Sequence, residues 1–144
     1  MKISFALEIY NELFYNYHDC KFYIAGSIRR EKEEVRDIDV VCVGKTLPTF
    51  SNVTYLAQGA KINRFLYKDV QIDLYLADEN NYESMLLFLT GSQAFNKKMR
   101  FVAKSKKYKL SQYGLFDKDN NLLSNKEKEI FNLLNITYVN PNKR

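Results

Sequence analysis

Three aspartates have a spacing suited to divalent cations. Asp37 and Asp39 lie one residue apart before the apolar run VVCV, and Asp73 lies in VQIDLYLA. Side chains alternate along a strand, so Asp37 and Asp39 share a face, and Asp73 projects from the polar face of its own strand. If the two strands are neighbours, the carboxylates converge, and a divalent cation must offset their repulsion. Such oxygen ligands suit Mg²⁺, and two ions can clamp both reacting oxygens of a phosphoryl transfer.

The residues before Asp37 are suited to binding phosphate. Gly26 lets the backbone approach a phosphate closely. The amides and hydroxyl at Ser27, at a helix start, can bind anions, and Arg30 can add a bidentate contact. The alternative for the two aspartates is that both are solvated at a strand edge. The alternative for Arg29 and Arg30 is surface pairing with Glu31, Glu33 or Glu34.

Hydrophobic periodicity predicts the elements that position these residues. We expect helices over residues 3–17, 81–89, 93–105 and 126–134, and strands over 21–25, 38–44, 53–57, 62–67 and 70–77. A short helical start follows Gly26-Ser27, a hairpin-like piece spans 110–123, and the chain ends in a polar tail. The sequence Thr90-Gly91-Ser92 interrupts the helical pattern.

Charge divides the chain at this same break. The sequence has 144 residues and a net charge of +5. Residues 91–144 contain 12 of the 22 Lys and Arg but only 4 of the 17 Asp and Glu. A basic C-terminal part beside a mildly acidic N-terminal part suggests a nucleic-acid grip next to a cation site, with ordinary lysine-rich solubility as the alternative. We place a boundary between two subdomains here.

Other features narrow the class of protein. No apolar run reaches the roughly 20 residues of a membrane span, and the N-terminus lacks the apolar segment of a signal peptide. Cys20 and Cys42 lack metal-ligand spacing, which predicts reduced thiols and a cytoplasmic protein. The single histidine, His18, is expected to cap the first helix or to be solvated.

Two motifs resemble a known family. The segment GSIRREKEEVRDIDV with VQIDLYLA resembles the nucleotidyltransferase superfamily pattern of Gly-Ser, Asp-x-Asp and a third carboxylate. The segment FLTGSQAFNKKMR (88–100) closely resembles the palm-to-thumb junction of family X DNA polymerases, and KYKLSQYGLF resembles their thumb. The resemblance implies an α+β fold: a nucleotidyltransferase palm with a mixed β-sheet flanked by helices over residues 1–88, and a small α/β thumb over residues 89–144.

The family resemblance also implies an activity. The chain would be a template-directed polymerase that adds dNMP to a primer 3′-hydroxyl with release of pyrophosphate, in gap-filling DNA repair. Asp37, Asp39 and Asp73 would bind two Mg²⁺ ions, with Mn²⁺ as a substitute. The expected partners are gapped or primer–template DNA and a dNTP, the expected state is a monomer, and the compact, Lys- and Asn-rich chain would suit a virus or phage.

The predicted helix 93–105 has a polar stripe opposite an apolar side. Its expected polar members are Gln93, Asn96, Lys97, Arg100 and Lys104. By resemblance, Gln93 packs on the incoming base, Asn96 touches its minor-groove edge, and Lys97 and Arg100 approach the template. Phe88 and the bend at Gly91 would discriminate against ribose. Phosphate contacts are expected from Lys104, Lys106, Lys107 and Lys109.

The sequence departs from the family pattern at several positions. Arg36 stands where the family often has Gly, and Leu89 and Gln93 replace a common Phe and Asp. The loop that contains Glu31, Glu33 and Glu34 is expected to weaken nucleotide binding. The 20 residues before the first strand cannot hold helix-hairpin-helix modules, so we expect no lyase activity and a weak grip on downstream duplex.

Two rival functions stay open. One is a template-independent nucleotidyltransferase acting on RNA ends, a protein or a small molecule. Asn96 and Arg100 argue against it, because such an enzyme has no template base pair to inspect. The other is a degenerate palm that only binds nucleic acid, against which the presence of all three carboxylates argues.

Overall fold

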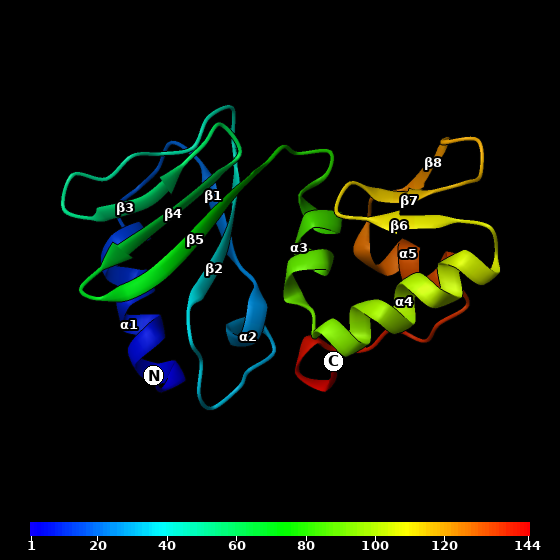
Figure 1. Cartoon of the computed structure of the whole chain (residues 1–144), viewed down its shortest axis with the longest axis horizontal. Coiled ribbons are helices and arrows are strands. Elements are labelled where there is room, and N and C mark those ends of the chain that lie inside the picture. The colour runs from blue at the N-terminus through cyan, green and yellow to red at the C-terminus, as the bar shows by residue number, and fades with distance from the viewer.

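The computed structural model describes residues 1–144 and contains two β-sheets (Figure 1). The larger sheet has the strand order β1-β2-β5-β4-β3. Only β2 and β5 are parallel, so the sheet is mixed, as expected. The strands are β1 (Lys21–Ile24), β2 (Ile38–Val43), β3 (Thr54–Gln58), β4 (Ile62–Tyr67) and β5 (Val70–Ala77).

The interior strand β2 is almost completely buried because helices cover both of its faces. Val40 and Cys42 belong to a core that α1 (Ile3–Phe14) closes. Val41 faces the other way and packs with Met85 of α3 (Tyr82–Thr90). Asp39 shares its face with Val41, so strand alternation directs its carboxylate to the α3 side of the sheet.

Helix α1 ends earlier than expected. Its last residue is Phe14, not residue 17. Tyr17 instead packs against Phe22 and Phe50, with ring centroids 5.7 and 5.9 Å away. These aromatic contacts draw the chain off the helix axis, which sequence periodicity alone does not reveal.

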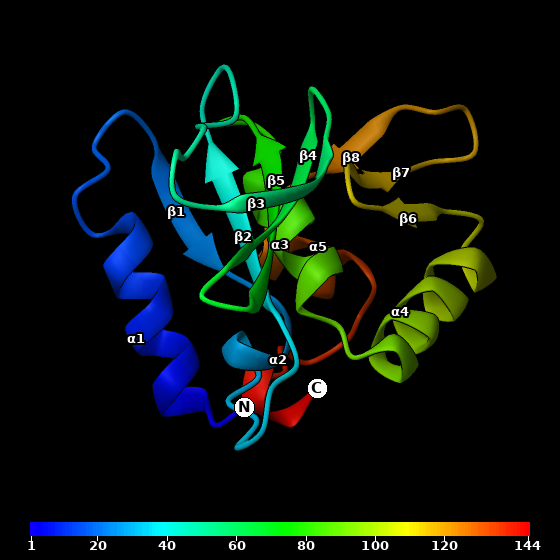
Figure 2. The same ribbon diagram turned by 60° about the vertical axis from the view of Figure 1, so that its left-hand side comes forward.

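A second, three-stranded sheet and three helices form the other half of the molecule (Figures 1 and 2). The expected hairpin is a three-stranded antiparallel sheet. Its core includes Leu87 of α3, Met99 and Ala103 of α4, and Phe131 of α5. The elements are α4 (Gln93–Ser105), β6 (Lys109–Ser111), β7 (Gly114–Phe116), β8 (Leu122–Ser124) and α5 (Glu127–Leu133).

The prediction of a polar tail is wrong. A short 3₁₀ turn, η1 (Pro141–Lys143), brings Arg144 back under α4. The Arg144 side chain is fully buried and lies over the rings of Phe95, Phe131 and Tyr138. The segment folds because aromatic faces and a buried carboxylate on α5, Glu127, provide partners for the guanidinium.

Both cysteines are free thiols. Their sulfur atoms lie 3.1 Å apart in a hydrogen bond that Cys42 donates to Cys20. None of the helices has the length and apolar character that crossing a membrane requires.

Candidate active site

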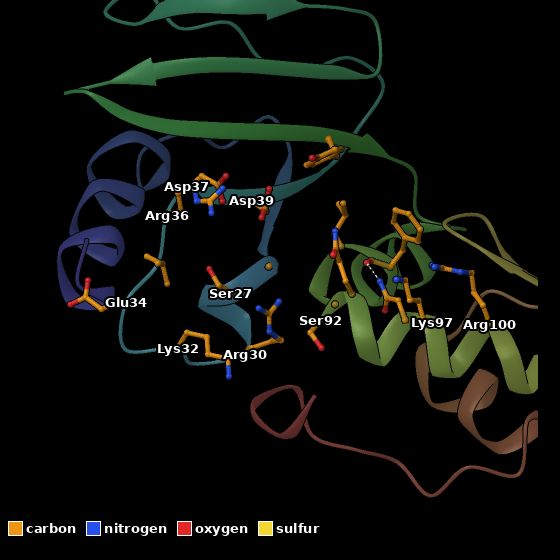
Figure 3. A pocket seen from close by; sticks show the side chains of 18 residues that line it. Ser27, Arg30, Lys32, Glu34, Arg36, Asp37, Asp39, Ser92, Lys97 and Arg100 are labelled. Carbon is orange, nitrogen blue, oxygen red and sulfur yellow. Dashed lines mark hydrogen bonds between the residues drawn. The ribbon is translucent and has the colours of Figure 1, made fainter.

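A cavity of about 960 Å³ lies between the α3 side of the large sheet and the N-terminal half of α4 (Figure 3). Asp37 and Asp39 enter it from the start of β2, and Lys97 and Arg100 enter it from α4. Most of the predicted site residues line it, although they come from three separate segments. They are Gly26, Ser27, Arg30, Asp37, Asp39, Phe88, Gly91, Gln93, Asn96, Lys97 and Arg100.

Besides Lys109 at the start of β6, four predicted residues do not line the cavity. Asp73 is the register partner of Asp39 on the neighbouring strand β5 but is covered by another side chain. Lys104 is exposed further along α4, and Lys106 and Lys107 follow the end of that helix. The roles of these four residues stay predictions.

Burial and mutual repulsion perturb the first two carboxylates. Burial raises the pKa of Asp39 to about 7, with further upward contributions from Asp37 and Asp73. Burial, then the charge of Asp73, also raises the pKa of Asp37. Arg64 and Arg30 offset only part of the effect on Asp39. Two carboxylates so placed gain from a nearby cation, because it favours their charged forms.

Asp73 is held by an arginine that the sequence analysis did not single out. Arg64 of β4 donates two hydrogen bonds to the Asp73 carboxylate, from Nε to Oδ1 at 2.8 Å and from Nη2 to Oδ2 at 3.1 Å. Gln71 adds a third hydrogen bond, to Oδ1 at 3.2 Å. As they stand, no three carboxylate, thiol or imidazole groups are gathered to hold a metal ion. A cation that uses Asp73 must therefore compete with the Arg64 guanidinium.

The β4–β5 turn explains how Arg64 reaches Asp73. Lys68 and Asp69 form a two-residue link, and both have positive φ angles, 49° and 63°. Such a link fixes the register of a hairpin, and here it pairs Arg64 with Asp73 across the strands. The closely spaced strands 62–67 and 70–77 are the signal from which this pairing was predictable.

Gly26 supports the site in two ways. Its φ angle is +63°, in the left-handed region that favours glycine. A Cβ at this position would collide with the Asp39 carboxylate. The two segments are also joined through their backbones, because the Ala25 amide donates to the Asp39 carbonyl at 2.8 Å. The glycine is therefore required for contact with Asp39, in addition to any approach of a phosphate.

Arg30 is placed to bind an anion. It lies directly after α2 (Gly26–Arg29) and donates to the carbonyl of Thr90 at 2.5 Å. Its Nε is buried and has no hydrogen-bond partner. A buried guanidinium nitrogen without an acceptor is costly, so a shift of the side chain that brings Nε to an anionic oxygen in the cavity would be favoured.

The surface pairing considered for Arg29 is wrong. Arg29 instead donates two hydrogen bonds to Glu127 of α5, at 2.9 and 3.0 Å, and one to the Thr90 hydroxyl at 2.7 Å. Glu127 also accepts from Arg144 and Tyr138, each at 3.0 Å. Burial opposes ionisation of Glu127, but its hydrogen bonds with Arg29 and Arg144 outweigh it and lower the pKa. Arg29 and Glu127 lie 98 positions apart in the sequence, so local sequence patterns could not predict this pairing.

The polar face of α4 begins at a capped terminus. The Ser92 side chain accepts from the Phe95 amide at 3.3 Å, and the Gly91–Ser92 peptide bond is cis. Asn96 donates to the carbonyl of Phe88 at 2.8 Å, which joins two predicted nucleotide contacts (Figure 3). Met99 is buried and Phe95 and Val102 are partly buried, as the predicted apolar side requires.

Comparison with solved structures defines the fold. The chain superimposes over its whole length on 76% of a Leishmania infantum polymerase beta chain from a ternary P/T complex, with a TM-score of 0.84 and 21% sequence identity. A family profile described as DNA polymerase beta thumb matches residues 85–144. The α+β fold is that of polymerase beta.

Sequence relatives define the family. The chain is 32% identical over 140 residues to repair DNA polymerase X of African swine fever virus (isolate Tick/Malawi/Lil 20-1/1983), covering 83% of this chain and 78% of that protein. It is also 32% identical over 125 residues to the DNA polymerase/3′-5′ exonuclease PolX of Bacillus subtilis, of which it spans only 22%. The chain belongs to the family X DNA polymerases.

Proposed function

We propose that the chain is a template-directed DNA polymerase that fills gaps in repair, with residues 1–88 as palm and 89–144 as thumb. It adds dNMP to a primer 3′-hydroxyl and releases pyrophosphate. Its relationship to repair DNA polymerase X supports this activity. The observation that carries the proposal is a single cavity in which Asp37 and Asp39 face the polar side of α4 (Figure 3).

The carboxylates fit divalent cations. Asp37 and Asp39 would hold the Mg²⁺ that accompanies the nucleotide, and Asp73 would join them on a second ion, with Mn²⁺ as a substitute. The raised pKa values of Asp37 and Asp39 are those of crowded carboxylates that a cation would relieve. Asp73 fits once Arg64 withdraws. When bound, the ions supply positive charge for the triphosphate and the attacking hydroxyl.

The chain's own residues bind and orient the triphosphate and the primer end. Arg30 and Ser27 bind the triphosphate, because both line the cavity beside the carboxylates. The primer hydroxyl attacks the α-phosphate in line, and Asp73 accepts its proton. Positioning and charge stabilisation supply most of the rate enhancement.

The N-terminal half of α4 inspects the nascent base pair. Gln93 packs on the incoming base, and Phe88 with Gly91 faces its sugar. Asn96 reads the minor-groove edge after releasing the Phe88 carbonyl, which it binds at 2.8 Å. Lys97 and Arg100 contact the template, and Lys104, Lys106 and Lys107 add phosphate contacts that position DNA without reading its sequence.

We further propose that the protein acts as a monomer. The relationship to proteins of African swine fever virus supports a viral enzyme working in the cytoplasm of a host cell.

Replacing Asp73 with Asn tests the catalytic assignment. The Asp73→Asn variant keeps the shape of the side chain, so it is expected to fold and to bind primer–template DNA. Extension in Mg²⁺ is expected to fall by about a hundred- to a thousandfold, the scale on which a charge-stabilising group contributes. Asp69→Asn, on the exposed β4–β5 turn, is the matched control. Normal extension by Asp73→Asn contradicts the assignment.

A further inference from the structure

Phe101 is an exposed aromatic on the helix that lines the candidate active site. It is 74% exposed, although it lies in the middle of the amphipathic helix α4. It takes no part in the aromatic contacts of this half of the molecule, where Phe95 and Tyr138 pack on Phe131. Phe101 therefore contributes nothing to the core that the other aromatics form.

The helical neighbours of Phe101 are cationic or small. Residues three and four positions away adjoin it on the helix surface, and these are Lys97, Lys98, Lys104 and Ser105. All four are exposed. Helix α4 contains no acidic residue, and none of its side chains takes part in an ion pair. The ring thus lies in a patch of lysines that have no protein partner.

This patch continues the polar face of the cavity. Lys97 and Arg100 line the cavity opposite Asp37 and Asp39 (Figure 3). Phe101 directly follows Arg100 and lies one helical turn beyond Lys97. A strand whose base is paired beside Arg100 would therefore lie within one helical turn of this patch.

We propose that Phe101 is a stacking platform for an unpaired template base, the first on the 5′ side of the templating base, with Lys97, Lys98 and Lys104 binding the adjoining phosphates. The proposal rests on the proposed function, since it requires a template at α4. Exposed aromatics among cationic side chains bind single strands in this way, and stacking tolerates any base because every base has a π-face.

An open primer–template with a 5′ template overhang tests the proposal. 2-Aminopurine is placed at the first overhang position, and its fluorescence and the Kd of the DNA are measured with the full chain. Wild type is expected to quench the probe. Phe101→Ala is expected to abolish most quenching and to weaken binding about fivefold or more, the scale of one base–aromatic stack. Phe101→Trp is expected to retain both.

Two controls separate stacking from other effects. An abasic site at the probe position, or a template that ends at the templating base, is expected to give wild type and Phe101→Ala the same Kd. Tyr15→Ala removes an aromatic that is 77% exposed but lies at the end of α1, and it is expected to bind like wild type.

Several results would overturn the proposal. Equal quenching and equal Kd for Phe101→Ala and wild type exclude stacking. A concentration-dependent dimer in sedimentation that Phe101→Ala dissociates, with DNA binding unchanged, assigns the patch to a second copy of the chain.

Failure of the proposed function gives a different result. Wild type that quenches the probe without inserting nucleotides rejects the polymerase activity and keeps the stacking site, so the two failures are distinguishable.

Discussion

Arg64 holds both carboxylate oxygens of Asp73, the residue that is proposed to accept the primer hydroxyl proton. The Asp73 side chain is only 5% exposed, whereas Arg64 is 48% exposed. The arginine is therefore free to swing into solvent, while the carboxylate stays in place. In the absence of metal, the guanidinium supplies the positive charge that a divalent cation would otherwise provide.

Replacing Arg64 should make stability depend on Mg²⁺. Arg64→Gln leaves Asp73 without its charged partner, so the Tm in chelator is expected to fall. Added Mg²⁺ should restore it, because the cation takes over the charge, and the Mg²⁺-induced rise in Tm is expected to be about twice that of wild type or more. Thermal unfolding with EDTA and with Mg²⁺ measures this. Equal Mg²⁺ responses for variant and wild type would show that no metal uses Asp73.

Asp39 should destabilise the metal-free protein at neutral pH. Its pKa is raised from 3.8 to about 7, so the folded state holds a proton that the unfolded state has lost between these values. Stability in EDTA is therefore expected to fall as pH rises from 4 to 7. Asp39→Asn should remove this contribution and stabilise the fold at pH 8 by on the order of 2 kcal/mol, while abolishing insertion. Urea unfolding across this pH range tests it, and an unchanged pH slope in the variant contradicts it.

The effects of substituting Gly26 and Asp39 on folding stability should be coupled. Gly26→Ala adds a Cβ at a φ of +63° and directly against the carboxylate, so it is expected to cost about 1–2 kcal/mol in folding and to weaken metal binding. In the Asp39→Ala background the collision disappears, and only the backbone cost should remain. A double-mutant cycle by urea unfolding measures the difference. Full additivity would mean that the two residues do not interact.

Glu127 should stabilise the whole fold rather than metal binding. It is buried and accepts hydrogen bonds from Arg29, Arg144 and Tyr138. Glu127→Gln leaves two arginines without a charged partner and is expected to cost about 3 kcal/mol. Glu129→Gln, an exposed carboxylate on the same helix, is the matched control and should be neutral. A Glu127→Gln variant with nearly wild-type stability would show that the hydrogen bonds between Arg29 and Glu127 do not stabilise the contact between α2 and α5.

The lowered pKa of Glu127 adds a check by pH. A carboxylate with a lowered folded-state pKa contributes stability above its unfolded pKa and loses it as pH falls through the folded value. The stability difference between wild type and Glu127→Gln is therefore expected to shrink in acid, below about pH 4.5.

Local sequence patterns were sufficient to predict most of the large sheet. Strand alternation in IDVVCV and VQIDLYLA gave the correct faces, and β4 and β5 have the expected bounds. The adjacency of β2 and β5, assumed from the carboxylates, is observed. The amphipathic pattern of α4 likewise gave bounds of Gln93–Ser105 and the buried side at Met99.

Long-range pairings were not predictable in the same way. Arg29 lies next to glutamates in the sequence, but its partner is Glu127, 98 residues away. Arg144 follows a polar segment and is nevertheless buried, because its partners are rings and a carboxylate from other elements. Such contacts depend on how the elements assemble, and local periodicity contains no information about that assembly.

Single-nucleotide insertion on a one-nucleotide gapped duplex tests the central claim most directly. Each of the four dNTPs is offered against each template base, with Mg²⁺, with Mn²⁺ and with EDTA. We predict insertion that needs a divalent metal and that follows the template. Insertion indifferent to the template base, or no insertion with either metal, would contradict it.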